Sequence, residues 1–158
     1  MNIEFTLNGR KVSALCEADD SLFTVLRSLG MYSVKCGCET TNCGLCTVHM
    51  DGKAVLSCSV PAMRAAGHEI VTLEGLQDEA KKLGACLAGE GAEQCGYCAP
   101  GMMMNVFALA RENPAAADDE IDAYMAGNLC RCSGYVSQRR AIKKYLAMVL
   151  EESGEVRA

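Results

Sequence analysis

Apolar and polar residues alternate along the first part of the chain with the period of two that is typical of β-strands. Residues 3–7 alternate in this way, Asn8-Gly9 follows, and a second alternating stretch reaches Leu15. Asn-Gly between two such stretches is a strong signal for a β-hairpin. Further strands are expected at residues 47–50, 53–57 and 69–73, with Asp51-Gly52 as a tight turn between the first two. The N-terminal part is therefore predicted to form a small sheet.

One helix is predicted between the hairpin and the later strands. Residues 19–21, Asp-Asp-Ser, can each cap a helix N-terminus, and Gly30 is well placed to end the helix. Apolar residues recur between them at the spacing of one helix face: Leu22, Val25, Leu26 and Leu29. A helix and a hairpin that each carry one apolar face can pack together, so this part is predicted to be an α+β unit.

Beyond residue 76 the apolar period changes from that of strands to that of helices. Pro100 suits the first turn of a helix, and Asn113-Pro114 ends it. Four helices are expected, at about residues 78–89, 101–112, 118–126 and 137–152. Four helices with short connections favour a small bundle. The predicted fold class is thus α+β, with one domain at residues 1–76 and a helical domain at residues 77–158.

The composition argues against several functions. The chain has 158 residues, half of them apolar, and a formal net charge of −5. A nucleic-acid-binding surface needs a basic stripe, so no nucleic-acid partner is expected. No stretch approaches the roughly 18 consecutive apolar residues of a membrane span. The N-terminus lacks the basic and then apolar profile of a secretion signal, so a cytoplasmic location is expected.

Eleven cysteines in this chain need an explanation. Disulfides are rare in the cytoplasm, so thiolate–metal sites are the better interpretation. Cys38, Cys43 and Cys46 have the spacing C-x4-C-x2-C, and Cys58 follows after eleven residues. This is the plant-type pattern of a [2Fe–2S] cluster. Residues 34–46 show neither the apolar period of a strand nor that of a helix, as expected for a loop that folds around a metal.

A second set of four cysteines lies at the ends of predicted helices. Cys95 and Cys98 precede the helix that begins near Pro100, and Cys130 and Cys132 lie between the third and fourth helices. The C-x2-C pair is weak evidence alone, but it is strong together with C-x-C and the plant-type set. Four plus four thiolates are enough for two [2Fe–2S] clusters.

The three remaining cysteines are predicted to lie outside the clusters. Cys16 and Cys86 have apolar neighbours and are interpreted as small buried side chains. Cys36 lies two residues before Cys38, but only Cys38 gives the plant-type spacing. Cys36 is therefore interpreted as a bystander, while an alternative ligand or a redox-sensitive thiol stays open.

Three segments resemble motifs of the molybdenum hydroxylase family. Gln-Cys-Gly-Tyr-Cys-Ala-Pro-Gly at residues 94–101 and Gly-Asn-Leu-Cys-Arg-Cys-Ser-Gly-Tyr at residues 127–135 resemble its second-cluster motifs. Lys35, Gly37-Cys38 and the Cys-Gly-Leu-Cys-Thr-Val run at residues 43–48 resemble its first-cluster motif. The resemblance covers about residues 3–150. It is to the separate small iron–sulfur subunit of xanthine dehydrogenase-like, nicotinate dehydrogenase-like and carbon monoxide dehydrogenase-like enzymes.

The resemblance implies a β-grasp ferredoxin domain with the plant-type cluster, followed by a helical domain with the second cluster. Gln94 and Cys132 match family positions that lie against the molybdopterin of a large partner subunit. Electrons would pass from molybdenum to the helical-domain cluster, then to the plant-type cluster, and on to FAD where an FAD-binding subunit is present. The implied substrate is a purine, another N-heterocycle or an aldehyde.

Two further expectations follow from the resemblance. Thr41 stands where the family usually has Gly, so the loop backbone is expected to differ there. The surface around residues 94–102 and 128–135 is expected to dock on the large subunit. Met102 and Tyr135 are expected among its contacts, because Met and aromatic residues are common in interface cores.

Three functions are compatible with these residues. The first is the electron-transfer subunit of a molybdenum hydroxylase, the second is a free-standing ferredoxin-like carrier, and the third is a zinc-stapled interaction module. A free carrier would not need the helical part. Zinc sites usually use paired C-x2-C motifs rather than the uneven C-x4-C-x2-C spacing. The chain shows no nucleophile–base pair or phosphate loop, so no catalytic residue is predicted on it and substrate conversion is expected on a partner.

Overall fold

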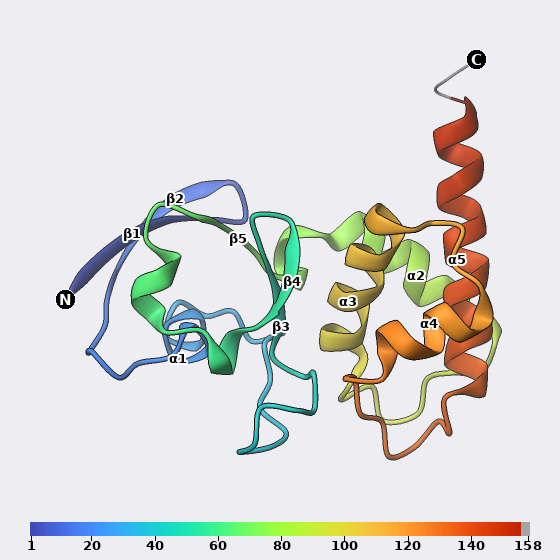
Figure 1. Cartoon of the computed structure of the whole chain (residues 1–158), viewed down its shortest axis with the longest axis horizontal. Helices are drawn as coiled ribbons and strands as arrows, with labels where there is room; N and C mark the ends of the chain where they lie inside the picture. The colour runs from blue at the N-terminus through green and yellow to red at the C-terminus, as the bar shows by residue number, and fades with distance from the viewer. Residues whose placement is uncertain (156–158) are drawn as a thin grey trace.

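The computed structural model describes residues 1–155 and shows two parts side by side, a sheet part and a helical part (Figure 1). The five strands are β1 (Asn2–Leu7), β2 (Arg10–Leu15), β3 (Thr47–Met50), β4 (Lys53–Leu56) and β5 (Glu69–Val71). They form one sheet in the order β2-β1-β5-β3-β4. The β1–β5 pair is parallel and the other pairs are antiparallel.

Both predicted hairpin turns have the backbone that their sequence demands. Asn8 and Gly9 have φ angles of 49° and 77°, and Asp51 and Gly52 have φ angles of 49° and 81°. Two successive residues with positive φ make the type I′ turn, whose twist matches that of the flanking strands. The strand pattern and these two turns therefore agree with the sequence prediction.

Helix α1 (Leu22–Ser28) covers the sheet and supplies much of its core. The Ser21 side chain caps it by accepting a hydrogen bond from the Thr24 backbone N–H at 3.2 Å. Leu22, Val25 and Leu26 of this helix are buried together with residues of the sheet. Burying one such side chain contributes about 1.5–3 kcal/mol, so this apolar face fixes α1 on the sheet.

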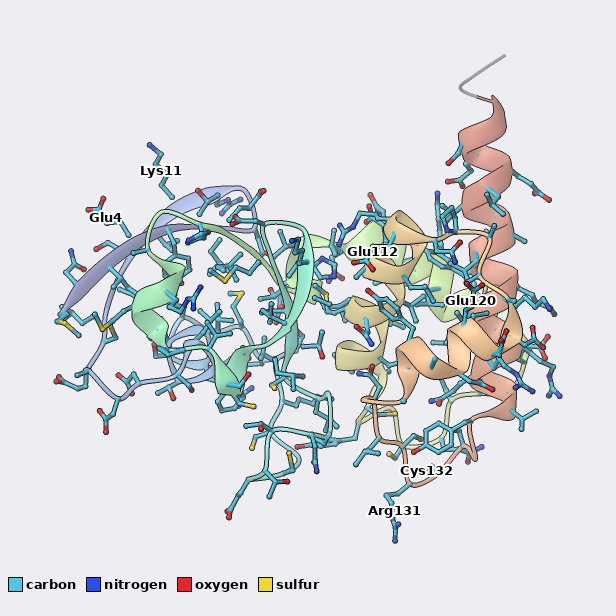
Figure 2. The ribbon with its side chains drawn as sticks, viewed as in Figure 1. Glu4, Lys11, Glu112, Glu120, Arg131 and Cys132 are labelled. Carbon is cyan, nitrogen blue, oxygen red and sulfur yellow. The ribbon has the colours of Figure 1, made fainter. Side chains whose placement is uncertain are left out.

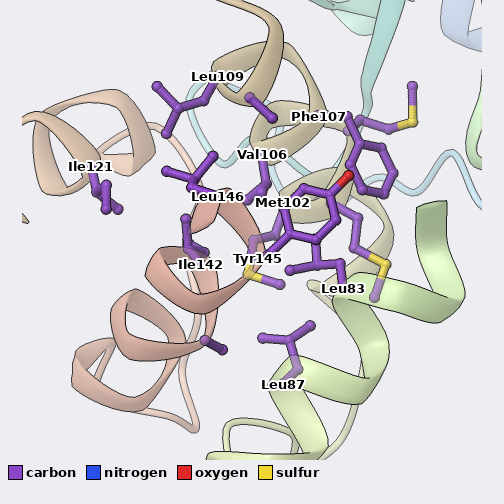
Figure 3. Close-up of a cluster of buried hydrophobic side chains, with 14 of the residues drawn as sticks. Leu83, Leu87, Met102, Val106, Phe107, Leu109, Ile121, Ile142, Tyr145 and Leu146 are labelled. Carbon is purple, nitrogen blue, oxygen red and sulfur yellow. The ribbon is translucent and has the colours of Figure 1, made fainter. Parts of the chain in front are cut away.

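The helical part contains four α-helices packed around a shared core. They are α2 (Gln77–Gly89), α3 (Ala99–Glu112), α4 (Asp118–Met125) and α5 (Val136–Glu155). Figure 3 shows side chains from all four meeting in one cluster that includes Leu83, Val106, Ile121 and Ile142. Helix α3 is buried on almost every side, because the other helices cover one side and strands β3 and β4 cover another. A helix that is apolar all round needs such a surrounding.

Several element ends differ from the sequence prediction. The strand expected at residues 69–73 ends at Val71, and a 3₁₀ turn, Leu73–Gly75, follows. The strand expected to reach residue 57 ends at Leu56, because Ser57–Ser59 forms another 3₁₀ turn. Helix α3 begins two residues earlier than expected, with Pro100 in its first turn.

The fold class is α+β, with a five-stranded sheet and five α-helices in the residues that the structure describes. Helix α2 begins at Gln77, next to the predicted boundary at residue 76. The division into domains at residues 1–76 and 77–158 stays a prediction, and residues 156–158 of the second domain lie outside the described residues. Within residues 1–155, every helix is too short or too polar to cross a membrane.

Candidate metal centres

The first cysteine set lies on the irregular loop between α1 and β3, together with the 3₁₀ turn after β4. Cys43 and Cys46 are buried, and Cys38 and Cys58 are partly buried. The Sγ atoms of Cys46 and Cys58 are 3.2 Å apart, and the thiols of Cys38 and Cys43 are hydrogen-bonded to each other. The four sulfurs thus form two pairs at one end of the sheet.

Backbone amides of the loop point at its sulfurs. N–H groups of Asn42 and Thr40 lower the pKa of Cys38 to about 6 by stabilising its thiolate. Burial raises the pKa of Cys58 to about 12, and the neighbouring Cys46 adds to this. Crowded, partly buried thiolates are unfavourable unless a cation accompanies them. This loop is therefore built for sulfur anions that share a positive partner.

The second cysteine set lies where three segments of the helical part meet. Cys95 and Cys98 precede α3, while Cys130 and Cys132 lie on the loop between α4 and α5. The Sγ atoms of Cys132 and Cys95 are 3.6 Å apart, and the thiols of Cys98 and Cys130 are hydrogen-bonded to each other. Residues far apart in the sequence are thus brought together as two further sulfur pairs.

Side chains as well as backbone amides donate to this second set. Burial raises the pKa of Cys130, but hydrogen bonds from the Ser133 hydroxyl, the Cys132 N–H and the Ser133 N–H outweigh it and lower the pKa to about 7. The Ser133 Oγ lies 3.2 Å from the Cys130 sulfur. The Gln138 Nε2 donates to the Cys98 sulfur at 3.8 Å. Sequence reasoning did not assign Ser133 or Gln138 these contacts, because Ser133 lies within the motif at residues 127–135 without being a ligand and Gln138 lies outside the motif.

The paired sulfurs fit a two-metal group better than a single metal ion. Two thiolates on one tetrahedral metal lie roughly 3.8 Å apart, given metal–sulfur bonds of about 2.3 Å. The distances of 3.2 Å and 3.6 Å are close to this value. Within residues 1–155, no three Cys, His, Asp or Glu side chains converge on one point. Two pairs of thiolates are the ligand set of a [2Fe–2S] cluster, which takes two ligands at each iron.

A backbone hydrogen bond joins the two cysteine sets. The Leu129 N–H, next to Cys130, donates to the Cys43 carbonyl at 2.9 Å. The buried Asn128 supports this contact, because its side chain donates to the Gly44 carbonyl at 3.2 Å and accepts from Asn105 at 2.7 Å. In Figure 1 the loops that carry both sets lie at the same end of the molecule. The two sets are therefore neighbours in space.

Glycines make this approach possible. Gly44 has φ +74°, and a Cβ placed there would lie 2.4 Å from the Gly127 carbonyl oxygen. A Cβ on Gly101, in the first turn of α3, would lie 2.3 Å from the Gly44 carbonyl oxygen. Only a residue without a side chain permits both contacts. The loop of the first set is thus pressed against the N-terminal end of α3.

A second bridge crosses between the sets on the surface. The Tyr97 hydroxyl donates to the Cys36 carbonyl at 3.0 Å, and Lys35 Nζ lies 4.7 Å from the centre of the Tyr97 ring. The Cys36 thiol is exposed and donates to the Cys38 carbonyl at 3.2 Å. Cys38, rather than Cys36, pairs with Cys43. This arrangement favours Cys38 as the ligand, and the bystander role of Cys36 stays a prediction.

Thr41 keeps the backbone that a glycine would favour. Its φ is +54°, in the left-handed region that β-branched residues rarely adopt. The expectation that the loop backbone differs because of Thr41 therefore finds no support in its own dihedral. The loop conformation requires positive φ at this position, and Thr adopts it at some conformational cost.

The outer edge of the second set is exposed. Gln94, Cys95 and Cys132 are all exposed, and Gln94 and Cys132 border the same small cavity. Figure 2 shows Arg131 and Cys132 at the outer end of the loop between α4 and α5. Three large side chains around this edge are also exposed, namely Tyr97, Leu129 and Tyr135.

One of the two expected interface contacts needs correction. Met102 is only 3% exposed and belongs to the core of the helical part, so its placement on a docking surface was wrong. Tyr135 is 44% exposed, but its hydroxyl also accepts a hydrogen bond from the Cys130 N–H at 2.9 Å. Tyr135 therefore supports the second cysteine set as well as facing outward.

Comparisons with known proteins agree with this geometry. Residues 5–88 match the family model of the 2Fe-2S iron-sulfur cluster binding domain, and residues 72–143 match that of the [2Fe-2S] binding domain. The chain is 41% identical over 146 residues to the nicotinate dehydrogenase small FeS subunit of Eubacterium barkeri, covering 90% of this chain and 93% of that protein. It is 42% identical over 140 residues to the xanthine dehydrogenase iron-sulfur-binding subunit of Escherichia coli O157:H7, covering 85% and 87%.

Solved structures show the same likeness. The crystal structure of quinoline 2-oxidoreductase from Pseudomonas putida 86 contains a chain with a TM-score of 0.89 and 36% identity, and the match covers 96% of both chains. The aldehyde oxidoreductase from Desulfovibrio gigas has a TM-score of 0.87 and 30% identity, covering 96% of this chain and 17% of that one. In the second case the match is to one part of a much longer chain.

Proposed function

This chain belongs to the family of small [2Fe–2S] iron–sulfur subunits of nicotinate and xanthine dehydrogenase-type oxidoreductases, and from this premise we propose how its two cysteine sets carry electrons. The chain is the iron–sulfur subunit of an oxidoreductase and serves electron transfer. Its residues 1–76 form a β-grasp ferredoxin domain with the plant-type cluster, and residues 77–158 form the helical domain with the second cluster. The paired sulfurs in each part support this assignment.

Eight cysteines are the proposed metal ligands. The first cluster takes Cys38, Cys43, Cys46 and Cys58, and the second takes Cys95, Cys98, Cys130 and Cys132. Clusters bound there would accept and release single electrons. The protein's own contribution is to hold the thiolates: backbone amides of residues 40 and 42 donate toward Cys38, and Ser133 donates to Cys130. Hydrogen bonds to cluster sulfurs raise the reduction potential, since they stabilise the more negative reduced state.

The hydrogen bond from Leu129 to Cys43 is the observation that carries the proposed electron path. It connects a residue next to one ligand with the carbonyl of another ligand. Electrons would enter at the exposed edge of the second set, where Gln94 and Cys132 face the molybdopterin of a large subunit. They would then cross from Cys130 through Leu129 to Cys43 and the plant-type cluster. An FAD-binding subunit or another acceptor would receive them there.

The partners follow from this direction of flow. The proposed large molybdopterin-binding subunit docks on the edge that exposes Tyr97, Leu129 and Tyr135, whose mixture of aromatic and apolar side chains suits an interface. It converts the substrate, a purine, another N-heterocycle or an aldehyde, so the chain itself needs no catalytic residue. We place the complex in the cytoplasm, because a reducing compartment keeps the eight proposed ligands from forming disulfides.

Purification of the native complex tests this proposal. A large molybdenum-containing subunit should co-purify with the chain, and the chain should carry about four irons, two for each [2Fe–2S] cluster. Substrate added to the complex should reduce both clusters. A chain that purifies alone with its iron would identify a free-standing carrier, and a chain that holds zinc in place of iron would identify an interaction module.

A further inference from the structure

His49 is a buried titratable residue that the electron path does not use. It lies on β3, is 1% exposed, and faces α3 of the helical part. Its Nε2 lies 2.6 Å from the Met104 carbonyl oxygen, and Nη2 of Arg111 lies 2.7 Å from its Nδ1 and, less closely, 3.2 Å from its Nε2. The same Nη2 donates to the Gly52 carbonyl at 3.1 Å. One side chain thus joins the sheet part to the helical part through two hydrogen bonds.

The two partners determine the protonation of the ring. A carbonyl oxygen can only accept, so Nε2 must carry the hydrogen. A guanidinium can only donate, so Nδ1 must offer a lone pair. His49 is therefore the neutral Nε2–H tautomer. A proton added at Nδ1 would replace an accepted hydrogen bond with a repulsive contact between two cations.

The position of His49 relates this contact to the clusters. Strand β3 begins at Thr47, directly after Cys46, and α3 begins at Ala99, directly after Cys98. The bond between His49 and Met104 therefore pins together two elements that each begin at a cluster ligand. A shift of β3 along α3 would change the separation of the two cysteine sets.

We propose that His49 is a positioning residue, which as a neutral ring between Met104 and Arg111 fixes β3 against α3 and so fixes the spacing of the two clusters. The inference rests on the proposed function, because it requires both clusters. It adds that the electronic contact between the clusters depends on pH. Protonation of His49 breaks the contact of its ring with Met104 and Arg111, and this contact is called the joint below.

The surroundings of the ring favour its neutral form. Burial lowers the pKa of His49, and the nearby Arg111 lowers it further, although the hydrogen bond to Met104 opposes them. The residues opposite His49 on β4 and β5 are Ala54 and Val71, which are uncharged. The nearby Asp51 carboxylate is engaged by His68 and by the Glu69 N–H. Arg111 is therefore the charged group that faces His49 among the described residues.

The sign of the pH effect follows from the lowered pKa. The joint is intact above the ordinary histidine pKa of about 6.5, where His49 is neutral in any state. The stability that the joint contributes falls as the pH drops below that value toward the lowered pKa of His49 in the folded protein. The reason is that His49 binds the proton readily only when its contacts to Met104 and Arg111 are broken. Acid conditions should therefore loosen the joint.

Two substitutions separate positioning from simple packing. In His49→Gln, the side-chain amide can donate to Met104 and accept from Arg111 but does not titrate. In His49→Met, the side chain fills similar space without either hydrogen bond. The readout is the magnetic splitting between the two reduced clusters, measured by EPR on the full chain from pH 5 to 8, with iron content measured in each sample. His68→Gln is the matched control, because His68 is the chain's other histidine and is exposed.

The expected result is a wild-type splitting that is constant at neutral pH and diminishes toward pH 5 with no loss of iron. His49→Gln should keep the splitting at all pH values, His49→Met should lose it even at neutral pH, and His68→Gln should behave like wild type. The proposal would be overturned if His49→Gln showed the same pH response as wild type. This comparison remains decisive even if His49→Met fails to assemble. Iron below four per chain in wild type would instead contradict the proposed function.

A cluster-independent measurement completes the test. Nitrogen NMR of ¹⁵N-histidine-labelled oxidised protein should show one ring as the Nε2–H tautomer that resists protonation at the ordinary histidine pKa of about 6.5. The resistant signal should disappear in His49→Gln. If the signal that is lost in His49→Gln instead titrated near the ordinary pKa of about 6.5 in wild type, the neutral joint would be refuted whatever the iron content.

Discussion

The two cysteine sets hold their sulfurs in different ways. The first set is mostly inside the protein, with Cys43 and Cys46 buried, and the N–H groups that reach its sulfurs come from the loop backbone. The second set has Cys95 and Cys132 exposed, and it receives side-chain hydrogen bonds from Ser133 and Gln138. A backbone-lined site depends on loop conformation, whereas a side-chain-lined site depends on individual residues. Substitutions should therefore act differently on the two sets.

Removal of one ligand should produce the largest effect. Cys43→Ser should abolish the first cluster and leave the second, because the two sets lie in different parts of the fold and metal binding is coupled to local structure. Iron analysis should then fall by half, from about four to about two per chain. Cys36→Ser is the control and should keep all its iron. Loss of all iron in Cys43→Ser would mean that the two parts depend on each other for assembly.

A substitution in the loop backbone should come next. Gly44→Ala needs a left-handed alanine and also places a Cβ 2.4 Å from the Gly127 carbonyl oxygen. Gly52→Ala has the same backbone demand, with φ +81°, but meets nothing within 4 Å. Gly52→Ala should lose about 1–2 kcal/mol of folding stability, and Gly44→Ala distinctly more.

Thermal unfolding and EPR of the two glycine variants distinguish strain from contact. Gly44→Ala should also weaken the magnetic splitting between the reduced clusters, since the clash separates the loops that Leu129 and Cys43 join. Gly52→Ala should leave the splitting unchanged. Equal losses of stability and unaltered splitting in both would show that the close approach at Gly44 is unimportant.

A change in one side-chain donor should have a smaller effect, confined to the second set. Ser133→Ala removes the hydroxyl that donates to the Cys130 sulfur at 3.2 Å. One hydrogen bond is worth about 1 kcal/mol, which corresponds to roughly 40 mV for a one-electron couple. Redox titration should show that the reduction potential of the second cluster is lower by about this amount, whereas the reduction potential of the first cluster is unchanged.

Ser59→Ala is the matched control for this titration. Ser59 lies next to the proposed ligand Cys58, but its hydroxyl donates to the Leu56 carbonyl at 2.9 Å rather than to a sulfur. Neither potential should change in this variant. A shift of the first cluster in Ser133→Ala would contradict the assignment of Ser133 to the second set.

The smallest expected effect is at Thr41, and it is stabilising. Thr41→Gly should relieve the strain of φ +54°, partly offset by the greater freedom of glycine in the unfolded chain. A gain of up to about 1 kcal/mol is expected, visible as a rise of a few degrees in the melting temperature. Thr40→Gly is the control, because it relieves no positive φ and should lower the melting temperature. A lower melting temperature in Thr41→Gly would show that the threonine side chain stabilises the loop.

Local patterns in the sequence predicted much of the fold. The two turns at Asn8-Gly9 and Asp51-Gly52 and the cap at Ser21 each depend on a few neighbouring residues and form as expected. Pro100 lies in the first turn of a helix, as expected, although that helix begins two residues earlier than predicted. The grouping of cysteines also agrees with the observed sulfur pairs. Short-range rules succeed here because the physical cause lies within a few residues.

Features that depend on distant neighbours could not be predicted. Met102 was expected at the surface, but α3 is enclosed by both helices and strands, which its own sequence does not reveal. His49 belongs to no sequence motif, yet its partners lie 55 and 62 residues away. The contact between Leu129 and Cys43 likewise joins loops 86 positions apart in the printed sequence. Only the packed structure brings these groups together.

EPR of the fully reduced chain tests the central claim, that two [2Fe–2S] clusters lie close enough to form one electron path. The account predicts two overlapping rhombic signals that integrate to about two spins per chain, one for each cluster. It also predicts magnetic splitting between them, because the hydrogen bond from Leu129 to Cys43 holds the two cysteine sets together. One signal that integrates to one spin per chain, or two signals without any interaction, would contradict it.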